Sequence, residues 1–181
     1  MTKSPTLRYR RPFITTLLIL FSLLAGTIAR ADEPTATGMV FGAQLGIARV
    51  NLDNNPVSNG GSWLFGSLSA DYLLSGELAV GLEAAGWTDQ ATNSTISEDV
   101  LGVFMILKYR PAQLSGLAFK LGGGYAKHRL WNSPAAADSS GDIAVVGVGI
   151  GEGVKLDLDY RRGDLERTRY EALTLSLGVS F

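Results

Sequence analysis

The groups with the most obvious potential for chemistry are one histidine and the carboxylate and hydroxyl side chains that follow it. His128 is the only histidine of the chain, and there is no cysteine. Downstream lie two acids and two serines, Asp138, Ser139, Ser140 and Asp142. A serine nucleophile needs a base within hydrogen-bond reach, so this composition supports catalysis only if the fold brings the groups together. One histidine without cysteine also argues against a transition-metal site, and we expect no metal and no other cofactor.

Charged side chains form a second group of candidates, because several of them recur at every second position. The segment 154–161 reads V-K-L-D-L-D-Y-R, with charged residues on one parity and apolar residues on the other. Alternate side chains of a β-strand point to opposite faces, so these charges would share one face. The same pattern elsewhere gives the full candidate set: Asp71, Glu83, Lys108, Lys120, Lys155, Asp157, Asp159 and Arg161, with Gln44, Glu77 and Arg110 on the same parity.

Eight segments of alternating polarity would position these charges. They cover residues 39–50, 63–74, 77–87, 100–110, 117–129, 142–150, 154–161 and 170–181. Each is close to the ~9–11 residues that a tilted membrane strand needs. Short connections at 75–76, 111–116 and 151–153 alternate with longer ones at 51–62, 88–99, 130–141 and 162–169. Outer-membrane barrels have this layout, with short turns in the periplasm, and an even strand count places both termini there too.

Alternation alone does not say which face is inside, because a soluble lipocalin-like barrel is apolar inside and polar outside. The membrane arrangement is favoured by aromatic residues at the edges of the apolar stripes and by an apolar last segment ending on Phe181. The polar parity is also rich in glycine, which suits a narrow lumen. We therefore predict an all-β fold, an eight-stranded antiparallel up-and-down transmembrane β-barrel in the outer membrane. A soluble periplasmic lipid-binding barrel is the alternative.

The lumen of such a barrel is narrow, so its side chains must fill it, and buried charges need partners. We predict a filled polar lumen closed by an internal ion-pair network, with a narrow conducting pore as the alternative. Glu83 and Asp157 are expected to be buried acids near mid-height, whereas Asp159 and Arg161 are expected nearer the outer mouth. The candidate partners of the two buried acids are Lys108, Lys120 and Lys155.

The fourth expected outer loop, residues 162–169, is rich in arginine. Its charged candidates are Arg162, Asp164, Arg167 and Arg169. Arginine makes bidentate hydrogen bonds to phosphate groups, so we expect this loop to contact lipopolysaccharide. Residues 162–164 also read Arg-Gly-Asp, a tripeptide that integrins recognise, although Gly-Asp is ordinary turn chemistry.

The first 31 residues have the features of a secretory signal peptide. A basic start precedes an apolar run at 13–25 that is too short to span a bilayer as a helix, and 29–31 reads Ala-Arg-Ala. We predict cleavage after Ala31, which leaves 32–181 as the barrel domain; an uncleaved anchor is the alternative. Loss of the five cations in this segment would leave 11 of the 16 Lys and Arg against 17 Asp and Glu. This excess of acidic over basic residues argues against nucleic-acid binding, which needs a basic patch.

Together, the signal peptide and the eight strands of 39–181 resemble the small eight-stranded outer-membrane proteins. This group includes the OmpA membrane domain, OmpX and Ail, the opacity proteins and YfaZ-like barrels. The end L-S-L-G-V-S-F, with Leu177, Val179 and Phe181 on its apolar parity, resembles the segment read by the barrel-assembly machinery. The resemblance implies a monomer among outer-membrane lipids and lipopolysaccharide, with a role in envelope integrity or surface interaction through four outer loops.

Some barrels that resemble this chain are enzymes that modify lipid A, and they supply the alternative function. The deacylase type uses a histidine, a serine two positions later on the same strand face, and a glutamate, but position 130 here is Leu130. The palmitoyl-transfer type uses a histidine, an aspartate and a serine at the outer rim, which His128 and its downstream neighbours match only in composition. We therefore expect no catalytic residue and a non-enzymatic protein.

Overall fold

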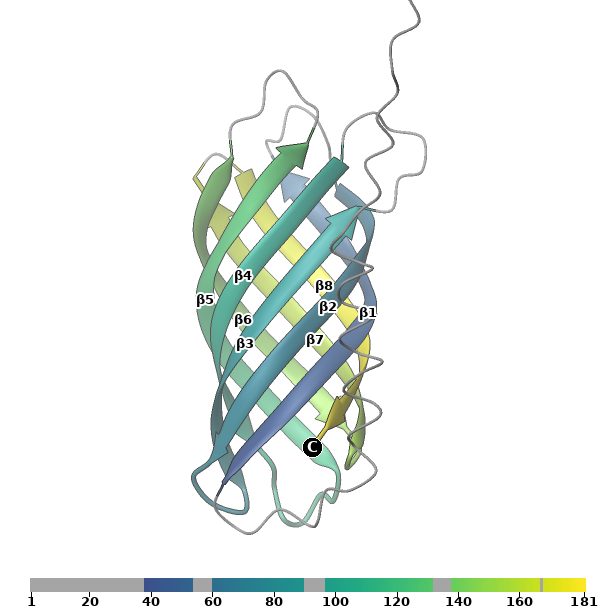
Figure 1. Ribbon diagram of the computed structural model, residues 1–181, viewed down its shortest axis with the longest axis vertical. Helices are drawn as coiled ribbons and strands as arrows, with labels where there is room; N and C mark the ends of the chain where they lie inside the picture. The colour runs from purple at the N-terminus through teal and green to yellow at the C-terminus, as the bar shows by residue number, and fades with distance from the viewer. Residues whose placement is uncertain (1–37, 54–59, 90–96, 132–137, 167) are drawn as a thin grey trace, which may run out of the picture. The chain divides into compact units, whose positions relative to one another are not determined.

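The computed structural model describes residues 38–53, 60–89, 97–131, 138–166 and 168–181, so the predicted signal peptide lies outside the described residues. Eight strands form a closed barrel in which each strand pairs antiparallel with the next and β8 pairs with β1 (Figure 1). They are β1 (Met39–Asp53), β2 (Gly60–Leu73), β3 (Leu78–Asp89), β4 (Ser97–Tyr109), β5 (Leu117–Trp131), β6 (Ser139–Ile150), β7 (Val154–Leu165) and β8 (Thr168–Ser180). The predicted eight-stranded antiparallel barrel is confirmed. In the described part of the chain, no helix is both long and apolar enough to cross a membrane.

The barrel has two different ends. At the turn end, the connections are residues 74–77, 110–116 and 151–153, and β1 starts and β8 finishes there. At the loop end, the connections are residues 54–59, 90–96, 132–138 and 166–167. The strands extend further toward the loop end than the alternating pattern predicts, so the connections at this end are shorter than expected.

The expectation that residues 162–169 form a loop is wrong. β7 continues to Leu165 and β8 begins at Thr168, so only two residues connect them. The strand is hard to see in the sequence because the outward positions 162 and 164 are charged, while Leu165, the apolar inward residue, is fully buried in the lumen. Glu166 adopts a φ of 48°, the left-handed conformation that such tight hairpin turns require.

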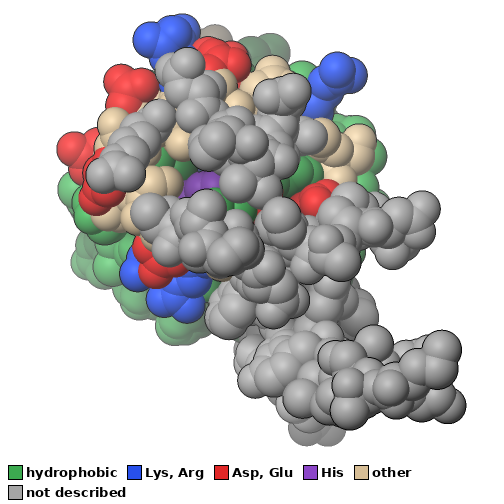
Figure 2. Space-filling model, turned by 90° about the horizontal axis from the view of Figure 1, so that it is seen from above, with side chains coloured by type: hydrophobic (Ala, Val, Ile, Leu, Met, Phe, Trp, Pro, Cys, Tyr) green, Lys and Arg blue, Asp and Glu red, His purple; other side chains and the backbone are tan. Residues whose placement is uncertain are grey.

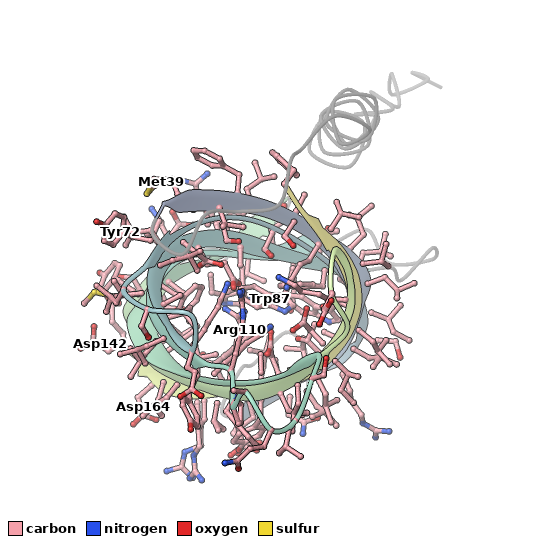
Figure 3. The ribbon with its side chains drawn as sticks, turned by 90° about the horizontal axis from the view of Figure 1, so that it is seen from below. Met39, Tyr72, Trp87, Arg110, Asp142 and Asp164 are labelled. Atoms are coloured by element: carbon pink, nitrogen blue, oxygen red, sulfur yellow. The ribbon has the colours of Figure 1, made fainter. Side chains whose placement is uncertain are left out.

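The outside of the barrel is apolar along every strand. Ile47, Leu82, Leu121 and Leu177, from four different strands, each expose 60% or more of their surface. Figure 3 shows Met39 and Tyr72 pointing away from the barrel. Exposed aromatic side chains gather nearer the turn end, at Phe41, Tyr72, Tyr109 and Phe119, whereas the exposed Tyr125 and Tyr160 lie near the middle of their strands. The apolar face is therefore outside, as in a membrane barrel and opposite to a lipocalin.

The inside has two halves of different chemistry, and the expectation of a polar lumen is right for only one of them. Most of the buried charged side chains lie from the turn end to mid-height; the exception is Glu98, which lies beside His128 near the loop end. The rest of the lumen toward the loop end is a packed apolar core, whose largest members are Trp63, Trp87, Phe65, Phe104 and Tyr170. Figure 3 shows Trp87 inside the ring of strands. An eight-stranded barrel leaves just enough space for side chains, and here aromatic rings fill it.

Phe41 and Phe181 close the seam between the first and last strands. Each backbone N–H donates to the carbonyl oxygen of the other at 2.9 Å. Their rings stack with centroids 6.4 Å apart. Leu177 and Val179 lie on the same outward face, opposite Leu45 and Ala43 of β1. The proposed assembly signal is therefore also the strand that closes the barrel, while its recognition by the assembly machinery stays a prediction.

Candidate functional site in the lumen and at the loop end

A continuous network of ion pairs crosses the middle of the lumen. Lys120 Nζ lies 2.5 Å from Asp157 Oδ1 and 3.2 Å from Asp159 Oδ1. Arg161 Nη2 lies 3.6 Å from Asp159 Oδ2 and 2.5 Å from Glu83 Oε1. β3 and β7 face each other across the closed barrel, so the pair of Arg161 and Glu83 spans the bore. All five side chains are buried, and together they fill the lumen at this height.

Neutral groups extend this network toward β1 and β2. Gln44 Nε2 donates to Asp157 Oδ2 at 2.8 Å, and Ser67 Oγ donates to Gln44 Oε1 at 3.3 Å. Nearer the turn end, Lys108 Nζ donates to both carboxylate oxygens of Asp71, at 2.6 and 2.8 Å. This pair is separate from the central network and joins β4 to β2.

The structure corrects part of the predicted pairing. Asp157 does pair with Lys120, one of its candidate partners. Glu83 pairs with Arg161 and with none of the three lysines. Lys155 makes no ion pair with any described residue. Asp159 and Arg161 both lie at mid-height below the apolar core, and not near the outer mouth as predicted, because β7 runs beyond them to Leu165.

Arg161 is the point where the polar and apolar halves of the lumen meet. It is fully buried. The carbon of its guanidinium lies 4.6 Å from the ring centroid of Phe104, 4.9 Å from that of Trp87 and 5.6 Å from that of Phe65. Aromatic faces attract cations at such distances, and the attraction is larger in a desolvated site. Its charge is therefore balanced by Glu83 on one side and by aromatic faces on the other. The sequence gives no signal for these contacts between distant strands.

Three buried aspartates of the lumen each have a glycine as cross-strand partner. The pairs are Asp71 with Gly81, Asp157 with Gly149, and Asp159 with Gly147. A Cβ atom added at any of these glycines would collide with the carboxylate opposite. Glycine on the lumen parity thus makes room for a charged neighbour as well as for close strand packing.

A cavity opens between these charges at the turn end of the lumen. Its volume is about 30 Å³, room for roughly two water molecules. We call it the turn-end cavity; its charged lining residues are Asp71, Lys108, Arg110, Lys120, Lys155 and Asp157. Figure 3 looks into this end of the barrel and shows Arg110 inside the ring of strands.

The loop-end rim carries exposed charges of both signs (Figure 2). Arg162 Nε lies 3.4 Å from Glu171 Oε1, and Arg169 Nε lies 3.6 Å from Asp164 Oδ1. Arg162, Gly163 and Asp164 are part of β7 and pair with β6 and β8, so the Arg-Gly-Asp tripeptide is held in a sheet and not at a loop tip. Arg167 lies outside the described residues. Between β5 and β6, a hydrogen bond from Lys127 lowers the pKa of Asp138, which lies just outside β6.

Of the acids and hydroxyl groups suggested for catalysis, the structure places Ser139 beside His128 as its cross-strand partner, whereas Asp138 and Ser140 are engaged with other side chains. His128 is buried on the lumen face of β5, and its Nε2 lies 3.6 Å from Oε2 of Glu98, a partner that the sequence reading missed. Asp138 pairs with Lys127, and Ser140 hydrogen bonds to Tyr125 and Glu166 on the outer face. Ser139, beside His128 in the sheet, is also buried. Within the described residues, no three His, Asp or Glu side chains are placed to hold a metal ion.

Solved structures share this architecture at low sequence identity. Ail, the attachment invasion locus protein of Yersinia pestis, is 14% identical with a TM-score of 0.60, over 78% of this chain and 98% of its own. Neisserial surface protein A is 18% identical with a TM-score of 0.54, over 81% of this chain and 98% of its own. OprG from Pseudomonas aeruginosa is 14% identical with a TM-score of 0.50, over 83% of this chain and 99% of its own. No family model and no curated protein sequence matches the chain. The fold is thus that of the small eight-stranded outer-membrane barrels.

Proposed function

We propose that the protein is a non-enzymatic outer-membrane barrel whose turn end faces the periplasm and whose loop end faces the cell exterior. The observation that carries the proposal is the outer surface, which is apolar along all eight strands while every described buried charge lies inside. Exposing this apolar outer surface to water would cost far more free energy than exposing it to lipid chains. Closure of the barrel satisfies the backbone hydrogen bonds, which a hydrocarbon environment demands. The filled core and the central ion pairs support a structural or surface role over conduction.

The buried histidine supports the non-enzymatic part of the proposal. A lipid A enzyme must present its base and nucleophile where a lipid can reach them. His128 is 2% exposed and faces the lumen, and its Nε2 has no hydrogen-bond partner among the described residues. Its carboxylate neighbour Glu98 is equally buried.

The test of the location and topology uses fractionation with gel mobility. We expect the protein in the outer-membrane fraction, and we expect an unboiled sample in detergent to migrate differently from a boiled one, because a closed barrel resists detergent until it is heated. Protease added to whole cells should cut only at the loop end, which reports the orientation. Recovery in the soluble periplasm, with one mobility in both samples, would disprove the proposal.

We further propose that the loop-end rim contacts the phosphate groups of lipopolysaccharide. Arg49 of β1, Arg162 of β7 and Arg169 of β8 are exposed near the loop end of three neighbouring strands. The ion pairs that Arg162 and Arg169 make are 3.4 and 3.6 Å long and exposed, so they contribute little and can exchange for phosphate. Among structures with this fold, Ail of Yersinia pestis has been crystallised with the heparin analogue sucrose octasulfate, which is also a polyanion.

The triple variant Arg49→Gln/Arg162→Gln/Arg169→Gln tests this contact. We expect it to bind labelled lipopolysaccharide about tenfold more weakly than the unaltered protein in a detergent titration, and the difference should shrink as salt is added. The matched control is Glu171→Gln, which removes a competing acid beside Arg162 and should preserve or strengthen binding. Equal affinity of the triple variant and the unaltered protein would rule out these arginines as the contact.

A further inference from the structure

The turn-end cavity has more positive charge than its own acids can balance. Four cations line it, and two acids oppose them. Lys108 pairs with Asp71 and Lys120 pairs with Asp157, so both acids are already engaged. The remaining cations are Arg110 and Lys155, and neither makes an ion pair or a side-chain hydrogen bond with any described residue.

These two cations are held in place by the barrel and partly removed from solvent. Arg110 follows β4, and its backbone N–H donates to the carbonyl of Glu77 at 2.7 Å. Lys155 is the second residue of β7, on the lumen parity. Both are intermediate in exposure, so neither is a freely solvated surface cation. If Arg110 and Lys155 only filled space in the lumen, a neutral side chain at either position would make the barrel more stable, because like charges in one cavity repel.

We propose that the turn-end cavity binds a small oxyanion group, with Arg110 and Lys155 as its principal ligands. The cavity has room for about two waters, so two oxygen atoms of a phosphate or carboxylate can take their places while the rest of the ligand stays in the open mouth. The guanidinium of Arg110 supplies paired donors for two such oxygens, and Lys155 supplies a further positive charge. Ser69 and Ser180 also line the cavity, and a serine hydroxyl group can donate a hydrogen bond to an oxyanion.

The experiment is a titration of the purified, folded protein in neutral detergent with inorganic phosphate, against sodium chloride of equal ionic strength. The readouts are the NMR signals of the Arg110 and Lys155 side chains and the unfolding midpoint, which a ligand specific to the folded state raises. We expect saturable shifts and a raised midpoint with phosphate only. In Arg110→Gln/Lys155→Gln the apparent affinity should fall at least about tenfold.

Lys127→Gln is the matched control, because it removes an exposed cation at the opposite end of the barrel, and it should bind phosphate like the unaltered protein. The double variant should still show the heat-dependent gel mobility of a folded barrel, since it removes repulsion and no ion pair. Its midpoint without phosphate should be unchanged or higher. Shifts that phosphate and chloride cause equally, or an equal loss of affinity in Lys127→Gln, would overturn the proposal.

The same titration in lipid nanodiscs distinguishes the source of the oxyanion. If a free phosphate or phosphate ester is the ligand, phosphatidylglycerol discs and phosphatidylcholine discs should give the same phosphate affinity. If an anionic lipid headgroup reaches into the mouth, phosphatidylglycerol should compete and weaken the apparent phosphate affinity. A normal gel shift without any phosphate effect would contradict the cavity site while leaving the outer-membrane barrel intact.

Discussion

Replacing Arg161 with methionine is expected to destabilise the barrel by about 3–5 kcal/mol, because it leaves the buried carboxylate of Glu83 without its partner. The side chain of Arg161 is fully buried and that of Glu83 is 3% exposed, so water cannot replace the lost ion pair. Asp159 loses a neighbouring cation as well but keeps Lys120 at 3.2 Å. Methionine retains much of the side-chain volume of arginine, so the loss of stability comes more from the lost charge than from lost packing. The measurement is the free energy of unfolding in urea, with the protein in lipid vesicles.

Two further variants make this result specific. Arg161→Met/Glu83→Gln removes both charges of the pair, and it should be more stable than Arg161→Met alone, since a buried pair replaced by neutral groups is often tolerated. Arg162→Met changes the next residue, whose side chain is 55% exposed and points outward, so its effect should stay below about 1 kcal/mol. A loss in Arg161→Met no larger than that in Arg162→Met would mean that the central ion pairs do not hold the lumen together.

The strands and their two faces could be predicted from the sequence because the alternation is local. One face of β7 carries Lys155, Asp157, Asp159 and Arg161 whichever residues they pair with, so the alternation of polar and apolar residues is enough to predict that they lie in the lumen. The alternation did not predict the end of β7 at residues 162–165, because the outward positions there are charged and the segment resembles a loop. Polar character there reflects the end of the apolar belt and not the end of the strand.

Pairing across the lumen could not be predicted, because it depends on strand tilt and register. Glu83 and Arg161 are 78 positions apart and meet only because β3 and β7 lie opposite in a closed barrel. The apolar core at the loop end was missed for a related reason. Trp63, Trp87 and Tyr170 fall on the polar parity, and the strand pattern around each one does not indicate which residues it meets across the lumen. Only the three-dimensional arrangement shows that they pack together.

Trp87→Ala should be the most damaging single truncation of that core, with an expected loss of about 3–5 kcal/mol. Trp87 is fully buried, and its ring lies 5.2 Å from that of Phe65, 6.1 Å from that of Phe104 and 6.0 Å from that of Tyr170. Its indole N–H also donates to Thr174 Oγ1 at 3.3 Å, which links β3 to β8 across the lumen. The strands are fixed in a closed ring, so they cannot collapse into the space that the indole leaves, and the cavity part of the cost remains.

Indole added to the unfolding assay can separate this cavity effect from a general loss of structure. An apolar cavity inside a protein binds small apolar molecules, so indole should raise the unfolding midpoint of Trp87→Ala and leave the unaltered protein unchanged. Leu82→Ala on the same strand is the matched control, because Leu82 is 60% exposed on the outer face, where lipid chains refill the space. Its loss should be clearly smaller than that of Trp87→Ala, and indole should not reverse it. If indole does not raise the unfolding midpoint of Trp87→Ala, or if Trp87→Ala and Leu82→Ala lose equal stability, the aromatic residues at the loop end do not form a tightly packed core.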